Sequence, residues 1–209
     1  LRDAKNGSYL VEKVYKKSGI KIEIIDGKKE AKIISNTNVF DTINKEKTFL
    51  YVDIGGGSTE FSVLINGKRN ESKSFKIGTV RMLNSKVEQV TLDEAEAWVR
   101  RNTLVHERIS LLGTGGNINK LHKIANINDN DPLSYSTLKA LYNQLDALTY
   151  EERIVKLGLN PDRSDVILPA AKLFIKVLNW SGAKDIYVPK SGLSDGMIRE
   201  LYKRKKLSF

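Results

Sequence analysis

The chain contains no cysteine, only two histidines and no long apolar run. Without cysteine there is neither a disulfide framework nor a thiol nucleophile, which fits a reducing compartment, and we expect a cytoplasmic protein. His106 and His122 stand apart without ligand spacing, so a zinc site is not expected. No apolar stretch approaches the length that crosses a bilayer, and no signal peptide is visible, so no membrane association is expected.

The chain has an excess of basic residues and enough apolar residues to fold. Of its 209 residues, 40% are hydrophobic, and 35 Lys and Arg outnumber 25 Asp and Glu, for a net charge of +10. The length suits one large or two small domains. The charge favours an anionic partner, such as polyphosphate, a nucleotide, nucleic acid or a membrane surface. Nucleic acid is the weaker expectation, because no recognition-helix motif or RNP-type aromatic signature is present.

The hydrophobic pattern predicts a mixed α/β sheet flanked by helices. A helix over 1–18, stopped by Gly19, precedes a strand over 20–25, an Asp26-Gly27 turn and helical residues 30–34. Further strands are predicted at 48–54, 59–65, 68–77, 108–112 and 185–189. Further helices are predicted at 93–101, 117–125, 135–148, 150–157, 163–181 and 192–203, besides a short one after Gly78. Thr91 and Glu94 suggest a capping box for the 93–101 helix.

The most informative motif is a glycine turn, Asp53 to Glu60, between two of these strands. Three glycines clear side chains away and permit unusual backbone conformations, so that successive N–H groups can surround an anion. Asp53 and Glu60 at its two ends are oxygen ligands of the kind that Mg²⁺ takes together with substrate phosphates. The motif therefore suggests phosphoryl chemistry.

A second glycine turn, Gly113 to Asn117, also follows a strand and leads into a helix. A helix N-terminus adds its dipole and free N–H groups to anion binding. A single glycine turn is more often only a turn. Two of them facing each other would hold one phosphate chain from both sides.

The Asp53–Glu60 segment resembles the signature of the exopolyphosphatase/guanosine pentaphosphate phosphatase (Ppx/GppA) family. The resemblance covers nearly the whole chain, and further segments follow the family's order: Leu1–Asn6, Ile22–Ala31, Gly78–Arg81, Gly113–Gly116, Arg163–Asp165 and Gly192–Gly196. The chain begins at Leu1 without an initiator Met. It is thus identified as the C-terminal part of a short-form member, in which the first lobe's opening strands would precede Leu1.

The resemblance implies an actin-like ATPase (ribonuclease H-like) fold with phosphate bound between two lobes. Residues 1–34 would be the remnant of the first lobe, and 35–209 would be the second, with a mixed five-stranded sheet flanked by helices. The last helix would pack back on the first lobe. A homodimer is compatible with the family.

The resemblance also assigns roles. Glu30 would be the general base that activates water, and Asp53 and Glu60 would hold Mg²⁺ or position the water. The alternatives are a solvated helix residue for Glu30 and an outward strand residue for Glu60. The phosphate-binding residues would be Gly55, Gly56, Gly57, Ser58, Gly113, Gly115, Gly116 and Asn117, while Arg81, Lys28 and Lys29 would line a channel for a long anion.

The implied function is Mg²⁺-assisted hydrolysis of a phosphoanhydride: the terminal phosphate of inorganic polyphosphate or the 5′-γ-phosphate of guanosine pentaphosphate (pppGpp), a nucleotide of the stringent response. Two alternatives stay open. One is an actin-like ATPase or kinase that uses the same turns on ATP. The other is a non-catalytic (p)ppGpp or polyphosphate-binding module, because Lys29 and Ser194 stand where the family usually has Glu and often has Arg.

Overall fold

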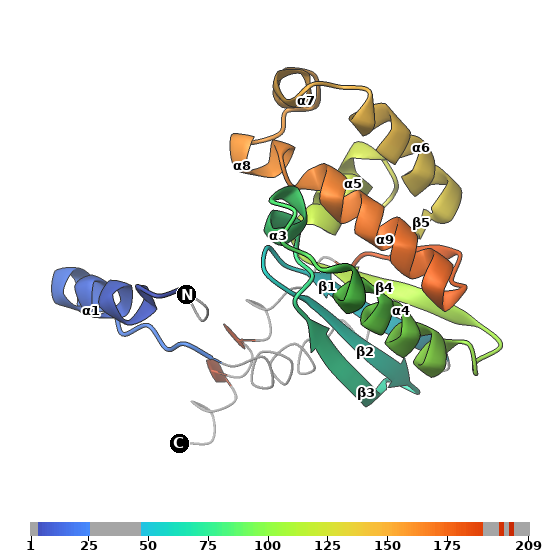
Figure 1. Cartoon of the computed structure of the whole chain (residues 1–209), viewed down its shortest axis with the longest axis horizontal. Coiled ribbons are helices and arrows are strands. Elements are labelled where there is room, and N and C mark those ends of the chain that lie inside the picture. Colours follow the sequence, from blue (N-terminus) through green and yellow to red (C-terminus); the bar gives the residue numbers. More distant parts are fainter. Residues whose placement is uncertain (1–3, 26–46, 190–196, 199–200, 203–209) are drawn as a thin grey trace. The chain divides into compact units, whose positions relative to one another are not determined.

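The computed structural model describes residues 4–25, 47–189, 197–198 and 201–202 (Figure 1). The chain divides into two compact units, Leu1–Thr37 with Leu193–Phe209, and Asn38–Gly192. The assignment of the two units to two lobes stays a prediction. In the described part of the chain, no helix is both long and apolar enough to cross a membrane.

The first unit contains the helix α1, Gly7–Ser18. Gly19 ends it in the left-handed conformation, with φ 70°, and its N–H donates to the carbonyl of Tyr15, as the sequence predicts. The strand predicted at residues 20–25 is wrong, because this stretch pairs with no strand among the described residues. Alternating apolar residues favour a strand only where a neighbour supplies the ladder. The predicted turn at 26–27 and helix at 30–34 lie outside the described residues.

The second unit contains a mixed sheet of six strands in the order β3-β2-β1-β4-β6-β5. Its strands are β1 Thr48–Ile54, β2 Thr59–Ile65, β3 Lys68–Phe75, β4 Ile109–Thr114, β5 Leu133–Ser134 and β6 Asp185–Tyr187. The first three form an antiparallel meander, and β4 and β6 join parallel to β1. The five predicted strands of this unit are confirmed, and the two-residue β5 is an addition that sequence periodicity cannot detect.

Seven helices accompany this sheet in the described residues: α3 Thr79–Leu83, α4 Gln89–Thr103, α5 Gly116–Ile124, α6 Tyr135–Asp146, α7 Tyr150–Leu157, α8 Pro161–Ser164 and α9 Ile167–Ser181. The helices α4 and α9 pack together across one face of the sheet, and α5 and α6 pack against α9 (Figure 1). The predicted 163–181 helix is divided into α8 and α9, with Asp165 and Val166 between them.

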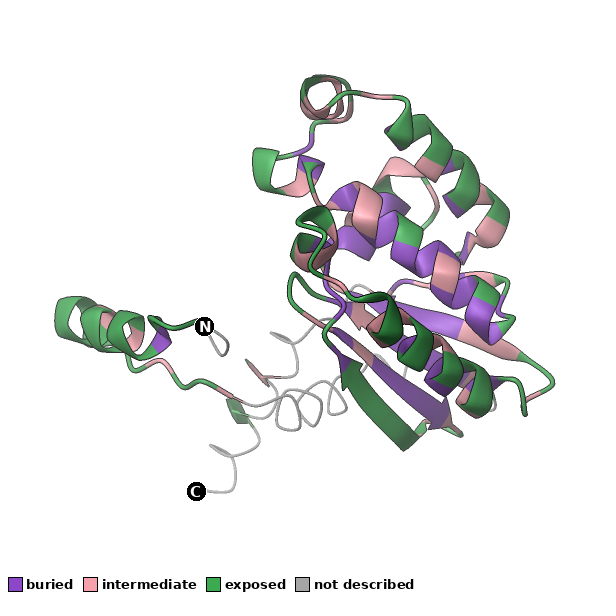
Figure 2. Ribbon diagram, viewed as in Figure 1, coloured by how far each residue is buried: buried purple, intermediate pink, exposed green. Residues whose placement is uncertain are grey.

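The core lies between this sheet face and α9. Leu50, Val52 and Ile54 alternate along β1 towards it, and nearly every residue of α9 is buried or half-buried (Figure 2). Phe61, Phe75 and Trp98 add a cluster of ring contacts on the same face. Trp98 and Trp180 both belong to this core.

The predicted cap of α4 is wrong. The helix begins at Gln89 with Glu88 as its N-cap, so Thr91 lies within the first turn and Glu94 beyond it. The pattern of Ser or Thr followed three residues later by Glu marks a cap only if the backbone turns there, and the same spacing occurs inside helices.

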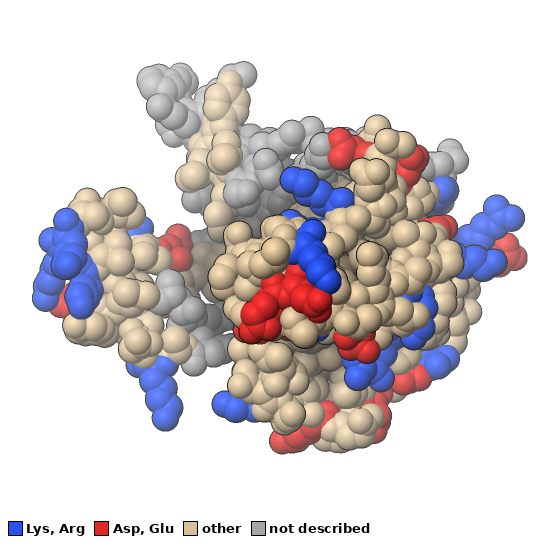
Figure 3. All heavy atoms as spheres, turned by 90° about the horizontal axis from the view of Figure 1, so that it is seen from above, with Lys and Arg blue, Asp and Glu red and all other residues tan. Residues whose placement is uncertain are grey.

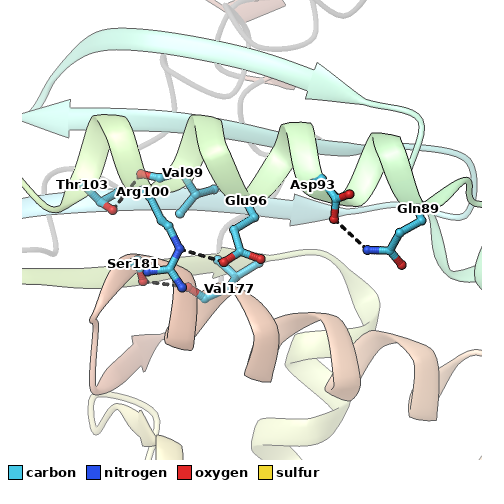
Figure 4. Close-up of polar contacts among 8 residues, drawn as sticks. All are labelled: Gln89, Asp93, Glu96, Val99, Arg100, Thr103, Val177 and Ser181. Carbon is cyan, nitrogen blue, oxygen red and sulfur yellow. Dashed lines mark hydrogen bonds and ion pairs between the residues drawn. The ribbon is translucent and has the colours of Figure 1, made fainter.

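Two buried hydroxyls at the ends of α4 and α9 are satisfied within their own helices (Figure 4). Thr103 donates to the carbonyl of Val99, and Ser181 donates to that of Val177, both at 2.7 Å. The exposed side of α4 carries the Arg100–Glu96 ion pair and the hydrogen bond from Gln89 to Asp93. The helix pair that supports the sheet therefore leaves neither of these buried hydroxyls unpaired.

Gly113 lies inside β4, and the structure predicts that a methyl group there is destabilising. A Cβ would lie 2.9 Å from Ile186 Cγ2, 3.1 Å from Ile118 Cγ1 and 3.3 Å from Phe174 Cε1. Gly113→Ala should lower the free energy of unfolding by about 1–3 kcal/mol, as overpacking of a core does. Denaturant unfolding measures this. Gly57→Ala is the control, since nothing lies within 4 Å of its Cβ position; equal stability losses in the two variants would contradict the packing argument.

Candidate functional site

The two glycine turns lie side by side because they follow neighbouring parallel strands. In the register of β1 with β4, Asp53 is next to Thr114. The first turn, Gly55–Ser58, begins just after β1, and the second, at Gly115, begins just after β4. Because both strands run in the same direction, both turns emerge at one edge of the sheet. The structure thus brings together two segments that are some sixty residues apart.

The carbonyl groups of the first turn are all occupied. The carbonyl of Gly55 accepts from the Thr79 N–H and that of Gly56 from the Val80 N–H, both at 3.0 Å. Arg81 donates its Nε to the Gly57 carbonyl at 2.7 Å. The carbonyl of Ser58 accepts from the Gly55 N–H at 2.9 Å.

The N–H groups of Gly56, Gly57 and Ser58 differ from the carbonyl groups of the turn. They donate to no group in the part of the chain that the structure describes, and the three glycines of the turn are exposed. Backbone N–H groups that face solvent without an internal acceptor can bind an anion. The turn therefore has the polarity that a phosphate requires.

Gly78 makes this arrangement sterically feasible. A Cβ at Gly78 would collide with the backbone of Gly56 and Gly57. The close approach lets the first N–H groups of α3 reach the carbonyls of the turn. The α3 N-terminus is consequently used to hold the turn and is not itself an anion site. Arg81, expected in a substrate channel, also contacts the turn through its Nε.

The second turn presents a helix N-terminus. Gly115, the N-cap of α5, has φ 100° and ψ 165°, a conformation that strongly favours glycine, and no side chain caps the helix. The first intrahelical bond runs from the Asn119 N–H to the Gly115 carbonyl. The N–H groups of residues 116–118 precede it and have no intrahelical acceptor. Together with the helix dipole they favour an anion.

Gly113 does not belong to this turn. It lies in β4 opposite Val52 and is buried against Ile186, Ile118 and Phe174. Its role in phosphate binding stays a prediction; the structure shows only a packing reason for a glycine there.

Asp53 and Glu60 face each other across β1 and β2. They are register partners in the antiparallel pair, where Cβ atoms lie about 4.5–5.5 Å apart. A Cβ at Gly115 would be 3.0 Å from Asp53 Oδ1, so the Asp53 carboxylate lies against the second turn. Both carboxylates are half-buried.

This pair suits Mg²⁺, which is commonly held by one or two carboxylates together with substrate phosphates and water. The residues described contain no cluster of three or more potential ligand side chains, as a protein-only cage would need. A metal at this position would therefore depend on the substrate for further ligands.

Arg163 is a site residue that the sequence analysis left without a role. Its Nη1 donates to the Asn117 Oδ1 at 2.7 Å, and its guanidinium lies over Gly116, where a Cβ would be 2.8 Å from Nη2. Its cationic group thus lies beside the N-terminus of α5. The only sequence signal was the segment Arg163–Asp165 in the family's motif order.

The sheet contributes two further polar groups near the carboxylates. Burial raises the pKa of the Tyr51 phenol above its ordinary value, and the negative charge of Asp53 raises it further. Burial lowers the pKa of Arg69, while Tyr51 and Glu60 act in the opposite direction. An arginine stays protonated through such a shift, so Arg69 adds positive charge near Glu60.

The remaining predicted residues, Glu30, Lys28 and Lys29, lie outside the described residues. Their roles as base and channel residues stay predictions.

Comparison with known proteins identifies the family of the chain. The sequence model of the Ppx/GppA phosphatase family matches residues 1–205. The chain is 30% identical, over 95% of its length, to a bifunctional 3-dehydroquinate synthase/phosphatase of Fusobacterium nucleatum, and 28% identical, over 96%, to a putative exopolyphosphatase of Haemophilus influenzae. It spans 33% of the first relative and 64% of the second.

Solved structures share the fold. An exopolyphosphatase from Cytophaga hutchinsonii has a TM-score of 0.80 at 23% identity, and the alignment covers 96% of this chain and 71% of that one. The Aquifex aeolicus Ppx/GppA family member has a TM-score of 0.72 at 24% identity, with 97% and 72% covered. The predicted actin-like α/β fold is confirmed, and the chain belongs to the Ppx/GppA phosphatase family.

Proposed function

We propose that the protein hydrolyses the terminal phosphoanhydride bond of inorganic polyphosphate or of pppGpp with the help of Mg²⁺. The observation that carries the proposal is the meeting of three elements at one sheet edge: the exposed N–H groups of Gly56–Ser58, the uncapped N-terminus of α5, and the Asp53–Glu60 pair. Each element alone is common. Together they can bind a phosphate and the metal ion that neutralises it.

The N–H groups would hold the oxygens of the terminal phosphate. Preorganised donors of this kind are most effective where negative charge develops in the transition state. Arg163 would add a cation on the α5 side. Arg81 would act indirectly, by holding the Gly57 carbonyl so that the N–H groups keep their orientation.

Asp53 and Glu60 would hold Mg²⁺, which supplies charge neutralisation at the transferred group and orientation of the attacking water. Glu30 would accept the proton of that water. A carboxylate serves as a base near neutral pH when negative neighbours or burial raise its pKa, and a bound phosphate chain provides such neighbours.

A long polyanion is also consistent with the net charge of +10. The charge is not gathered in one patch on the face shown in Figure 3, where acidic and basic side chains lie close together. The ion pair between Lys156 and Glu152 on α7, at 2.6 Å, is an example of such local neutralisation. This face therefore offers no single basic patch for a polyanion.

The direct experiment measures phosphate release by the full-length protein from long polyphosphate and from pppGpp, side by side, with and without Mg²⁺. Release that requires Mg²⁺ supports the proposal. Transfer of phosphate from ATP to an acceptor, without release from either substrate, would show a kinase instead. Tight binding without turnover would show a binding module.

Asp53→Asn and Glu60→Gln should each lower the rate of phosphate release at least about 100-fold, because a metal ion supplies several kcal/mol of transition-state stabilisation. The rate at saturating substrate and a Mg²⁺ titration check this. Glu71→Gln is the control, as it removes an exposed carboxylate from β3 in the same sheet. Rates close to wild type in both site variants would remove the pair from the reaction.

Glu30→Gln should lower phosphate release by about 10²–10⁴-fold, as loss of a general base does, while polyphosphate binding is retained because the phosphate-binding turns are unchanged. Release kinetics and equilibrium binding to labelled polyphosphate check the two parts separately. Glu71→Gln, the same substitution at an exposed position of β3, serves as the control and should keep a rate close to wild type. An unchanged rate in Glu30→Gln would mean that another group activates the water.

A further inference from the structure

A buried pair of hydroxyl groups lies directly beside the carboxylates. Tyr51 is 2% exposed and Thr114 is 6% exposed. The Thr114 Oγ1 donates to the Tyr51 Oη at 2.7 Å, and this hydrogen bond joins β1 to the end of β4. Neither side chain belongs to the phosphate-binding turns or to the carboxylate pair.

The register of the sheet places both hydroxyls on the side that carries the carboxylates. Side chains alternate along a strand, so Tyr51 and Asp53 share a face. Thr114 is the parallel partner of Asp53, and Glu60 is its antiparallel partner. Thr114 is also the last residue before Gly115, whose Cβ position is 3.0 Å from Asp53 Oδ1. The hydrogen bond is therefore formed where the second turn meets the carboxylate pair.

The Tyr51 hydroxyl can form a second hydrogen bond besides the one with Thr114. A tyrosine hydroxyl has one proton to donate and can also accept. Since Tyr51 accepts from Thr114, its own proton is left for a second partner. The negative charges of Asp53 and Glu60 act on the Tyr51 hydroxyl, and the positive charge of Arg69 acts in the opposite direction. A buried hydroxyl is expected to use its donor, and a carboxylate is a strong acceptor.

We propose that Tyr51 is a positioning residue for the carboxylate pair: the Thr114–Tyr51 hydrogen bond fixes the end of β4, and the phenol proton restrains the carboxylates that would hold Mg²⁺. The proposal rests on the proposed function of the site. It predicts that the two hydroxyls act as a unit, because removal of either one breaks the same connection.

The test is a double-mutant cycle with Tyr51→Phe and Thr114→Val, which remove the hydroxyls while they nearly preserve shape. Groups that orient metal ligands typically contribute about 10- to 100-fold in metal affinity or activity. Each single variant should weaken Mg²⁺ binding, measured by calorimetry in the presence of inorganic phosphate, by about this factor. The double variant should be no more than about twofold worse than either one. Thr114→Ser, which keeps the hydroxyl, should remain close to wild type.

Tyr187→Phe is the matched control. Tyr187 is a half-buried tyrosine of the same sheet, and its ring packs edge-on against Phe49. The Tyr187→Phe variant should bind Mg²⁺ with the affinity of wild type. Thermal unfolding verifies that each variant is folded, and if Tyr51→Phe fails to fold, the Thr114→Val and Thr114→Ser pair gives the same comparison. Unchanged Mg²⁺ binding, losses that simply add, or an equal loss in Tyr187→Phe would each overturn the proposal.

Two readouts keep this proposal distinct from the proposed function. If wild type binds Mg²⁺ but releases no phosphate from polyphosphate or pppGpp, the proposed function fails, while the calorimetric cycle still decides the role of Tyr51. If wild type binds no Mg²⁺ with or without inorganic phosphate, both proposals are overturned. If phosphate is released at the same rate and with the same Mg²⁺ requirement in all variants, only the role of Tyr51 is overturned.

Discussion

The arrangement of the site depends on the parallel pairing of β1 with β4. Both strands end at the same edge, Asp53 beside Thr114, so each following turn emerges next to the other. An antiparallel pairing would place the turns at opposite edges of the sheet, and no local change in either glycine segment could compensate. The pairing is stabilised from one face by α9, whose buried residues pack against the same strands. Core packing and site geometry are thus determined by the same contacts.

The two turns reach the same polarity by different means. In the first, the N-terminus of α3 and the Nε of Arg81 occupy the carbonyls and leave N–H groups exposed. In the second, a glycine N-cap without a side-chain acceptor leaves the first N–H groups of α5 unbonded. Helices usually gain stability from a Ser, Thr, Asp or Asn cap. The N-termini of the two helices therefore differ: that of α3 donates to the backbone of the first turn, whereas the first N–H groups of α5 have no such acceptor.

Sequence patterns predicted the local parts of this arrangement. The strands β1 and β2 follow from short apolar runs on either side of the glycine turn. The dipeptide Asn66-Gly67, which is typical of a hairpin turn, joins β2 to β3 with φ values of 51° and 71°. The pairing of Asp53 with Glu60 did not follow from their spacing, and it is the hairpin register of β1 with β2 that places them opposite each other. The contact of Arg163 with Asn117 could not be predicted from local patterns, because the two residues are 46 positions apart in the chain. The predictions that failed, the strand at 20–25 and the Thr91 cap, used local signals that tertiary structure did not support.

The site combines two carboxylates with N–H groups that can bind an anion, and this combination affects which ligand fits. Two carboxylates that face each other repel unless a cation lies between or beside them. Arg69 interacts electrostatically with Glu60, and Arg163 lies beside the N-terminus of α5. A phosphate alone would meet the carboxylates unfavourably, whereas a phosphate that arrives with a divalent cation satisfies both the carboxylates and the N–H groups. If the proposed function holds, the site would favour a metal-bound phosphate over a free one, because the metal would offset the charge of the carboxylates that lie beside the two turns.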